Sequence, residues 1–241
     1  MWRLLLLLPY FCAFSSELTV AIQEHNGYSA RDGKGYLNEL IREFDKNGVN
    51  AKFVHLPLRR ALTDYYGLKK YDCMIGGDED LLRFHGNNPD DKYFSDPHLV
   101  FKTRIFSKKK AYCDVNDLSG ESIIVINRFP YKKTFEGVKL SRVEIAPSLD
   151  QAIKMAKAGR ADALIGYVPT PNQELEEFKF CEELTLTKNF SKTHCYKSPE
   201  SLELINKINK ALKSLKKSGK LYEFLETSYG EKLAKEIYSE I

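Results

Sequence analysis

The chain of 241 residues lacks several patterns that would reveal its chemistry directly. It has no Cys-x-x-Cys and no His-x-x-x-His spacing, so the common signatures of a bound metal ion are missing. Acidic and basic residues are mixed along the chain and the formal net charge is only +4, which argues against nucleic-acid binding. The lysine-rich stretches 108–110 and 213–220 are typical of solvated surfaces. We therefore expect no metal, no cofactor and no nucleic-acid partner.

Long apolar runs are also missing, apart from one near the N-terminus. Residues 4–14 are apolar and follow Arg3, and Ala13-Phe14-Ser15 offers small residues at the cleavage positions. The run is about 11 residues long, well short of the roughly 20 that a bilayer-spanning helix needs. The sequence therefore predicts a signal peptide over residues 1–15 and an exported mature protein.

Cysteine is scarce, and its number is informative. Four cysteines follow the predicted signal peptide, at positions 73, 113, 181 and 195. An even number in an exported protein indicates disulfides, and four cysteines allow three pairings. Cys181 with Cys195 closes the shortest loop and is the preferred pair. Cys73 lies in the apolar run Cys73-Met74-Ile75, which favours a simple buried thiol at that position.

Strand-like and helix-like spacings of apolar residues alternate along the mature chain. Strands are expected at 18–22, 52–56 and 71–75, separated by one helix that ends at Asn47-Gly48 and a second that begins at Pro57. Strands that alternate with helices at this spacing imply βαβ crossovers and a parallel sheet.

The same alternation returns after an extended stretch at 99–106. Strands are expected at 122–126, 163–167, 183–187 and 193–196, and helices at 148–159, 198–219, 221–226 and 231–241. Ser148 and Gln151 form a capping box at the start of one helix. Removing 15 of 241 residues leaves 226, enough for two units of about 100 residues each. The chain is thus expected to be an α/β protein with two similar units.

Several short motifs occur in an order that is seen in one protein family. They are Asp32-Gly33-Lys34-Gly35-Tyr36, residues 57–62, Tyr71-Asp72 with Gly76-Gly77, Phe94-Ser95-Asp96-Pro97, Asp117-Leu118-Ser119-Gly120, Gly159-Arg160-Ala161-Asp162-Ala163 and residues 212–230. With these motifs, which extend over nearly the whole mature chain, the sequence resembles the periplasmic solute-binding proteins of extracellular family 3. That family is named for polar amino-acid ABC transporters.

The resemblance implies a two-lobed, Venus flytrap architecture in which two strands cross between the lobes. Lobe one would comprise residues 17–105 and 190–241, and lobe two residues 106–189. A small polar solute, an amino acid or a related carboxylate, would bind between the lobes and stabilise their closed form. The expected protein is a periplasmic monomer that passes its solute to an ABC transporter permease and catalyses no reaction.

Two other functions are compatible with the same resemblance. A soluble sensor would bind a ligand in the same way but dock to a separate receptor. A few relatives are periplasmic enzymes that dehydrate small cyclic acids, which requires a carboxylate with a raised pKa. Glu24 and Glu79 are the acids near the expected site that such an enzyme would use, although neither lies in a recognisable catalytic pattern.

The resemblance also implies ligand-binding residues in lobe one. Arg83 lies near the position of an arginine that binds the ligand's α-carboxylate, and its planar guanidinium offers two parallel donors. Asp78 lies just before it and would line the same site, and Tyr28 would stack on the ligand. Arg83 is separated from Phe94 by a longer interval than in the family.

Lobe two departs further from the family pattern. Tyr167 stands where the family commonly has an aspartate for the ligand's amino group, and a phenol does not neutralise an ammonium at pH 7. The sequence Asn127-Arg128-Phe129-Pro130-Tyr131 replaces a glycine-threonine pair. Arg128 would meet a second anionic group and Phe129 would extend the aromatic wall. An ordinary free amino acid is therefore less favoured than the family name suggests.

Overall fold

A computed structural model describes residues 17–24, 28–126, 131–169, 175 and 177–241. The expected signal peptide and the candidate residues Arg128 and Phe129 lie outside these ranges. Within the ranges, no helix combines the length and apolar character needed to cross a membrane.

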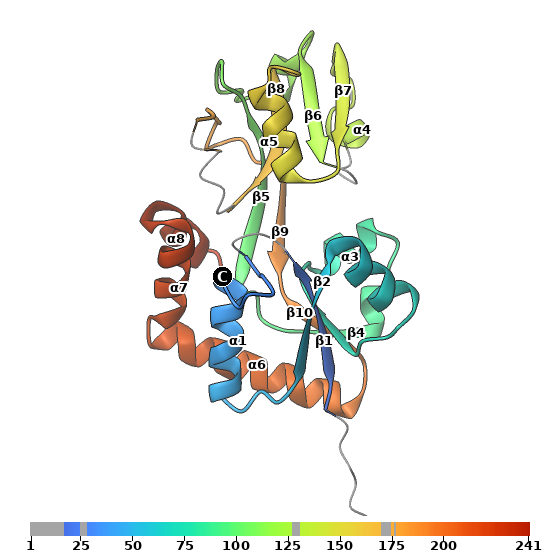
Figure 1. Cartoon of the computed structure of the whole chain (residues 1–241), viewed down its shortest axis with the longest axis vertical. Coiled ribbons are helices and arrows are strands. Elements are labelled where there is room, and N and C mark those ends of the chain that lie inside the picture. Colours follow the sequence, from blue (N-terminus) through green and yellow to red (C-terminus); the bar gives the residue numbers. More distant parts are fainter. Residues whose placement is uncertain (1–16, 25–27, 127–130, 170–174, 176) are drawn as a thin grey trace, which may run out of the picture.

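The chain forms two lobes, one above the other in Figure 1, that are joined by two strands. Lobe one contains a five-stranded sheet in the order β2-β1-β3-β10-β4. Its strands are β1 (Thr19–Glu24), β2 (Lys52–Pro57), β3 (Cys73–Ile75), β4 (Lys92–Phe94) and β10 (Thr193–Tyr196). Its helices are α1 (Tyr36–Lys46), α2 (Leu58–Leu62), α3 (Glu79–Phe84), α6 (Pro199–Lys217), α7 (Lys220–Tyr229) and α8 (Glu231–Tyr238). A π-helical turn (Thr63–Gly67) extends α2, and a short 3-10 turn (Pro89–Asp91) precedes β4.

Lobe two contains a second five-stranded sheet, in the order β7-β6-β8-β5-β9. Its strands are β5 (Leu99–Phe106), β6 (Ser122–Ile126), β7 (Arg142–Ala146), β8 (Ala163–Val168) and β9 (Thr187–Ser191). The helices are α4 (Tyr131–Thr134) and α5 (Leu149–Lys157), with a 3-10 turn at Val115–Leu118. The two mixed sheets flanked by helices confirm the expected α/β class and the two-lobed architecture.

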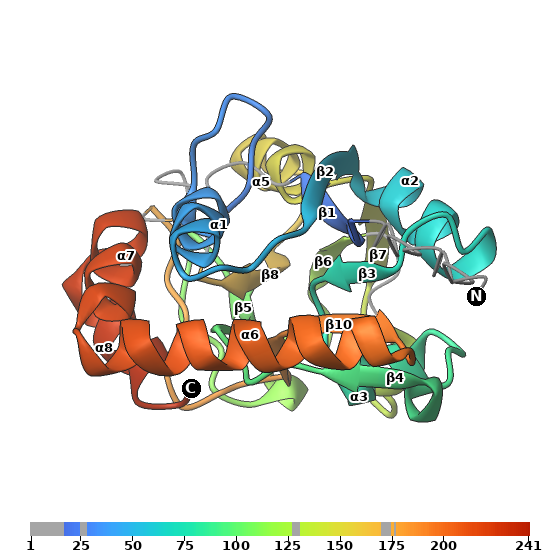
Figure 2. The ribbon, with the colours of Figure 1, turned by 90° about the horizontal axis from the view of Figure 1, so that it is seen from below.

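The core of lobe one follows from the amphipathic spacing of its helices. On α1, Leu37, Leu40 and Phe44 are fully buried and pack in one cluster with apolar residues of β1 and α6. Figure 2, seen from below, shows α6 running along lobe one with α7 and α8 at one end. Burying such side chains contributes roughly 1.5–3 kcal/mol each, so this cluster fixes the helices on the sheet.

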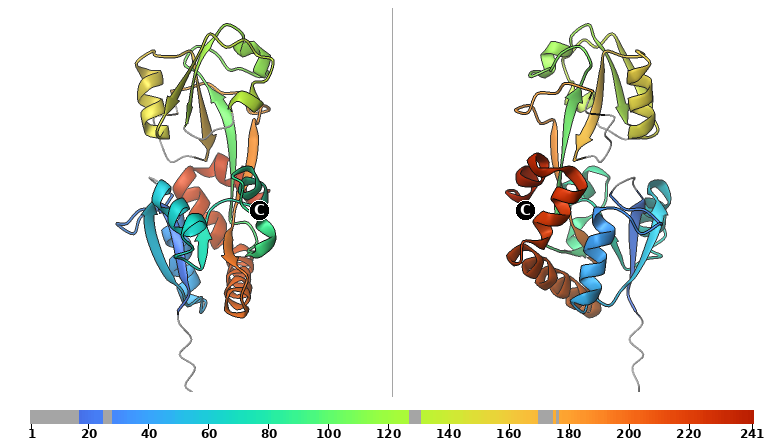
Figure 3. Two further views of the ribbon diagram at one scale, coloured as in Figure 1. Left: turned by 90° about the vertical axis from the view of Figure 1, so that its right-hand side faces the viewer. Right: turned by 60° about the vertical axis from the view of Figure 1, so that its left-hand side comes forward.

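The crossing strands β5 and β9 form an antiparallel pair, with Leu99 opposite Ser191 and Thr103 opposite Thr187. The last helix, α8, lies beside them (Figure 3). Five charged side chains connect this end of the chain to the strands. We name this group the hinge cluster: Lys102 and Arg104 on β5, Lys188 on β9, Glu236 on α8 and Glu240 just beyond α8.

The hinge cluster is partly shielded from water. Glu236 Oε1 lies 2.6 Å from Lys102 Nζ and 3.0 Å from the Arg104 guanidinium, and Glu240 pairs with both Lys102 and Lys188. The Arg104 side chain is only 3% exposed. Ion pairs that are partly buried are screened less by salt than exposed ones. The cluster therefore ties α8 to β5 through Glu236, and the residues just beyond α8 to both strands through Glu240.

One predicted strand is wrong. Residues 183–187 were expected to form a strand, but β9 covers Thr187–Ser191. Leu184 and Leu186 alternate as in a strand, yet they pack against an apolar cluster of lobe two before the crossing strand begins. The short elements α3, β4, α4 and β7 were not predicted. Each has six residues or fewer, so its apolar period is difficult to distinguish from that of a loop.

The predicted disulfide is also wrong. Cys73 bonds to Cys195 and Cys113 bonds to Cys181, so the Cys181–Cys195 pair does not form and Cys73 is not a free thiol. The reason is topological. Strand β10 pairs antiparallel with β3 in a register that places Cys195 opposite Cys73. Cys181 lies in lobe two, before the crossing strand β9, so a short separation in sequence was a poor guide.

These pairings can be tested by peptide mapping without reduction, which is expected to yield one peptide that links Cys73 to Cys195 and another that links Cys113 to Cys181. The first pair is 122 residues apart. Replacing both of its cysteines by alanine is expected to lower the free energy of unfolding by about 2–5 kcal/mol in denaturant titrations. A peptide that joins Cys181 to Cys195 would contradict the assignment.

Candidate functional site

The parallel strands of the two lobes end at edges that face each other (Figure 1). In lobe one, β1 is parallel to β2 and β3, and in lobe two β6 is parallel to β7 and β8. In open α/β sheets, ligands bind beyond the carboxyl ends of parallel strands. The residues at these two facing edges are therefore the candidate site.

Arg83 does not lie in the loop directly after β3. It belongs to the last turn of α3, and the extra residues before Phe94 form the end of this helix and a 3-10 turn. The Arg83 guanidinium is 3.1 Å from Asp80 Oδ1, and the Asp80 side chain is 88% exposed. Arg83 thus shares a solvent-facing side of α3 with an acid.

Asp78 is buried and both of its carboxylate oxygens accept hydrogen bonds from the backbone. Oδ1 accepts from Leu81 N at 2.9 Å, which caps α3, and Oδ2 accepts from Phe190 N of β9 at 2.7 Å. Gly76 and Gly77 have φ values of 126° and 84°, which turn the chain from β3 into this cap. Asp78 therefore attaches α3 to a crossing strand.

Tyr28 is buried at the start of the crossing strands. Its hydroxyl lies 2.9 Å from Ser191 Oγ on β9, and its ring contacts Tyr36 and the edge of Phe101 on β5. Burial raises the pKa of the Tyr28 phenol well above its ordinary value, so the hydroxyl stays protonated. Tyr28 connects the loop after β1 to both strands of the hinge.

The hydrogen bonds at Ser191 continue to a buried histidine. Ser191 Oγ lies 3.2 Å from His98 Nε2, and the His98 backbone oxygen accepts a hydrogen bond from Tyr36. His98 is fully buried, and burial lowers its pKa to about 3. A neutral imidazole is therefore part of the packing between the N-terminal loop and the crossing strands.

Tyr167 approaches the same place from lobe two. It lies near the carboxyl end of β8, opposite Thr103 of β5, and its ring meets the edge of Phe101 with the centroids 5.9 Å apart. Burial raises the pKa of its phenol, as it does for Tyr229 at the end of α7. Tyr28, Phe101 and Tyr167 therefore form a chain of ring contacts that runs from the loop after β1 across β5 to β8 in lobe two.

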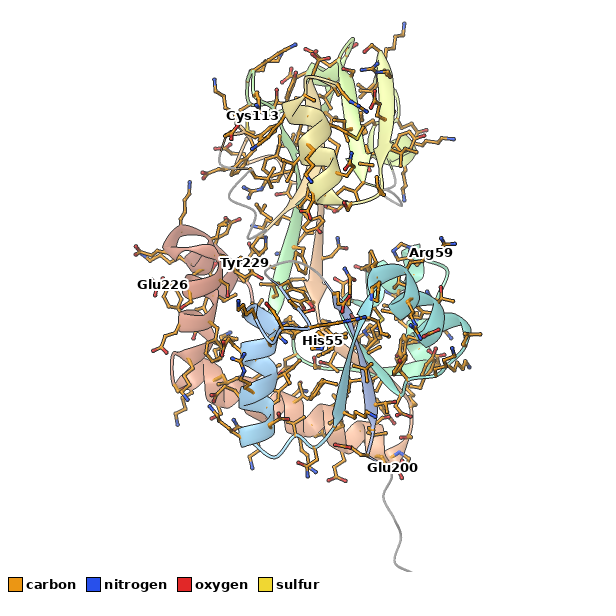
Figure 4. All side chains as sticks on the ribbon, viewed as in Figure 1. His55, Arg59, Cys113, Glu200, Glu226 and Tyr229 are labelled. Atoms are coloured by element: carbon orange, nitrogen blue, oxygen red, sulfur yellow. A yellow bond between two sulfur atoms is a disulfide. The ribbon has the colours of Figure 1, made fainter. Side chains whose placement is uncertain are left out.

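Sequence reasoning missed Tyr229. Figure 4 shows it beside the crossing strands, at the level of the space between the lobes. Its hydroxyl is buried and has no hydrogen-bond partner among the described residues. The only signal in the sequence was an aromatic residue at the end of a helix, directly before Gly230. That pattern does not distinguish a site residue from a packing residue.

The two acids that the enzymatic alternative would use are both paired. Glu24 forms an ion pair with Arg31, and Glu79 lies 2.9 Å from the ammonium of Lys192. Burial raises the pKa of Glu79, but the hydrogen bonds from Lys192 and from its own backbone outweigh burial and hold the pKa below its ordinary value. Glu79 is therefore an ionised partner of Lys192, not a proton donor.

Two arginines begin α2, at the carboxyl end of β2. Arg60 Nε lies 3.3 Å from Asp64 Oδ2, one turn further along. Arg59 is exposed and makes no ion pair or hydrogen bond with any described residue. His55, near the end of β2, contacts Asn38 through its Nε2, and burial lowers the pKa of this histidine.

A cavity and a group of two cysteines with a glutamate lie away from this edge. One cavity of about 450 Å³ borders Glu17 and Glu200, at the opposite end of lobe one (Figure 4). Cys113, Cys181 and Glu183 come close together, but the two sulfurs are bonded to each other. They offer no thiolate ligand for a metal ion.

No sequence family and no curated protein matches the chain. Several solved structures are similar to the chain. The GluR0 ligand-binding core from Nostoc punctiforme in complex with L-glutamate has a TM-score of 0.69 at 17% identity, over 89% of this chain and 100% of that one. A putative L-cystine ABC transporter protein from Listeria monocytogenes has a TM-score of 0.67 at 20% identity, over 92% and 99%.

An ancestral amino-acid-binding protein, a precursor of cyclohexadienyl dehydratase, has a TM-score of 0.66 at 17% identity, over 88% of this chain and 95% of that one. At these identities the likeness concerns the fold. The chain has the two-lobed fold of bacterial solute-binding proteins, as the sequence motifs predicted.

The buried histidines predict how stability depends on pH. His98 and His194 are fully buried and each has a pKa lowered to about 3, below the ordinary value near 6.5, so protons bind the unfolded chain more tightly. Stability that is present above pH ~6.5 is lost as the pH falls towards 3, by about 1.4 kcal/mol per pH unit for each histidine.

Urea titrations between neutral and acid pH are expected to show this slope. His98→Asn should lower by about one the number of protons taken up on unfolding in this pH range, so the fall in stability with falling pH should be less steep than in the wild type. Equal slopes for the wild type and His98→Asn would contradict the role of His98.

Proposed function

We propose that this protein captures a small polar solute between its two lobes and delivers it to an ABC transporter. The observation that carries the proposal is the pair of facing sheet edges, between which the described chain passes through β5 and β9. This arrangement allows the lobes to approach each other around a ligand that contacts both. The solute would act by stabilising the closed form in proportion to its extra contacts there.

The solute that fits best is a carboxylate-bearing molecule, an amino acid or a related compound. Aromatic side chains of the candidate site, Tyr28, Phe101 and Tyr167, supply apolar area at a small entropic cost. Structural neighbours that bind L-glutamate or serve L-cystine transport support the same solute class. A micromolar dissociation constant requires about −8 kcal/mol, which such a site can provide.

The proposal includes export. Residues 1–15 would be removed as a signal peptide, and the mature monomer would act in the periplasm, with lobe one formed by residues 17–105 and 190–241 and lobe two by residues 106–189. The two disulfides support this location, because disulfides persist in oxidising compartments.

We infer that the protein binds its solute without changing it. A dehydratase needs a carboxyl group whose pKa is raised towards neutrality. Glu24 and Glu79, the two acids proposed for that role, are both neutralised by basic neighbours. A sensor that docks to a receptor would share the binding step and differ in its partner, so pull-down with the transporter permease separates these two functions.

Differential scanning fluorimetry with a panel of solutes tests the proposal. The panel contains the L-amino acids, L-cystine, small dicarboxylates and polyamines, and the protein is unfolded and refolded beforehand to remove any solute retained during purification. At about 100 times the dissociation constant, a ligand stabilises by about 2.7 kcal/mol, which corresponds to roughly 5–10 °C in melting temperature for a protein of this size. No shift with any member of the panel would contradict solute binding.

A further inference from the structure

The charged side chains at the lobe-one edge are mostly neutralised within lobe one. Glu24 pairs with Arg31, Glu79 with Lys192, and Arg83 with Asp80. A group that is already paired has less to offer a ligand, because the ligand must replace an existing partner. A charged side chain that has no partner among the described residues is therefore informative.

Arg59 is such a side chain. It lies in the first turn of α2, directly beyond the carboxyl end of β2, and Figure 4 shows it at the upper edge of lobe one, on the side that faces lobe two. Successive residues of a helix point about 100° apart. Arg60 can therefore reach Asp64, one turn further along, while Arg59 points elsewhere and forms no ion pair with a described residue.

The local charge favours the start of α2 over α3 as the place for an anion. The α3 segment with its cap carries three acids, Asp78, Glu79 and Asp80, against one arginine, so its formal charge is 1 − 3 = −2. The helix α2 carries two arginines and no acid, which gives +2. Even after the pairs with Lys192 and Asp64 are counted, the first segment stays negative and the second positive. A carboxylate is attracted to α2 and repelled by α3.

We propose that Arg59, and not Arg83, binds the anionic group of the solute. This assignment rests on the proposed function and specifies the chemistry of its site. The guanidinium of Arg59 would donate two parallel hydrogen bonds to a carboxylate of the solute. When the lobes close, a solute held in this way would carry its remaining groups towards Tyr167 and the carboxyl ends of β6 and β8 in lobe two.

The assignment predicts which analogues of the solute bind more weakly. A solute whose carboxylate is replaced by a neutral carboxamide keeps its shape but loses the charge-assisted pair, so it should bind at least about tenfold more weakly. Each amino acid or dicarboxylate that stabilises the wild type in the solute panel therefore serves as a probe, together with its carboxamide.

Isothermal titration with these probes is performed on the wild type, Arg59→Ala and two matched controls, Arg60→Ala and Arg83→Ala. All three variants remove one arginine from the same lobe. The dissociation constant should rise at least about tenfold for Arg59→Ala and less than about threefold for the controls, while Arg59→Lys should fall between. Because Arg59 is exposed and unpaired, its substitution should leave the melting temperature without solute nearly unchanged.

The outcomes separate this inference from the proposed function. If no probe stabilises the wild type, the proposed function fails and the inference fails with it. If a probe binds the wild type and Arg59→Ala equally well, the inference is overturned and the proposed function stands. An equal loss in Arg59→Ala and Arg60→Ala would indicate a general effect of positive charge and would also overturn it, as would a larger loss in Arg83→Ala.

Discussion

The relative position of the two lobes depends on one antiparallel strand pair, β5 with β9. The chain passes from lobe one to lobe two through β5 and returns through β9, and the two strands pair from Leu99 and Ser191 to Thr103 and Thr187. Contacts from several parts of lobe one converge on this pair. Asp78 accepts a hydrogen bond from the backbone of β9, the Tyr28 hydroxyl bonds to Ser191, and the hinge cluster joins α8 to β5 and Glu240 to both strands. Any change in the angle between the lobes must therefore alter these hydrogen bonds and ion pairs or be accommodated by them.

This constraint explains why two of the expected ligand residues have other partners. The resemblance placed Tyr28 and Asp78 at the site, and both do lie at the carboxyl edge of lobe one. Their polar atoms, however, form hydrogen bonds with the crossing strand β9. The Tyr28 hydroxyl bonds to Ser191 of β9, and Asp78 caps α3 and accepts a hydrogen bond from Phe190 of β9. The charge available at this edge belongs to Arg59, because the other ionised side chains named at this edge are neutralised by neighbours.

The α/β class and most of the helices and strands were predictable from the sequence because their apolar periods are long enough to read. Short elements such as α3 and β7 were not, and the alternation of Leu184 with Leu186 imitated a strand. The disulfide pairing was predicted wrongly for a different reason. Distance along the chain says nothing about the register that places Cys195 opposite Cys73. Similarly, Arg83 and Arg59 are equivalent as residue types, and only the ion pairs around them distinguish a neutralised arginine from an available one.

Closure of the two lobes on a solute by movement about β5 and β9 is measured by small-angle X-ray scattering of the protein with and without a saturating concentration of a solute that stabilises it. We expect a smaller radius of gyration with solute, since closure brings the lobes together while their internal structure is retained. Scattering that is unchanged at saturation would contradict closure.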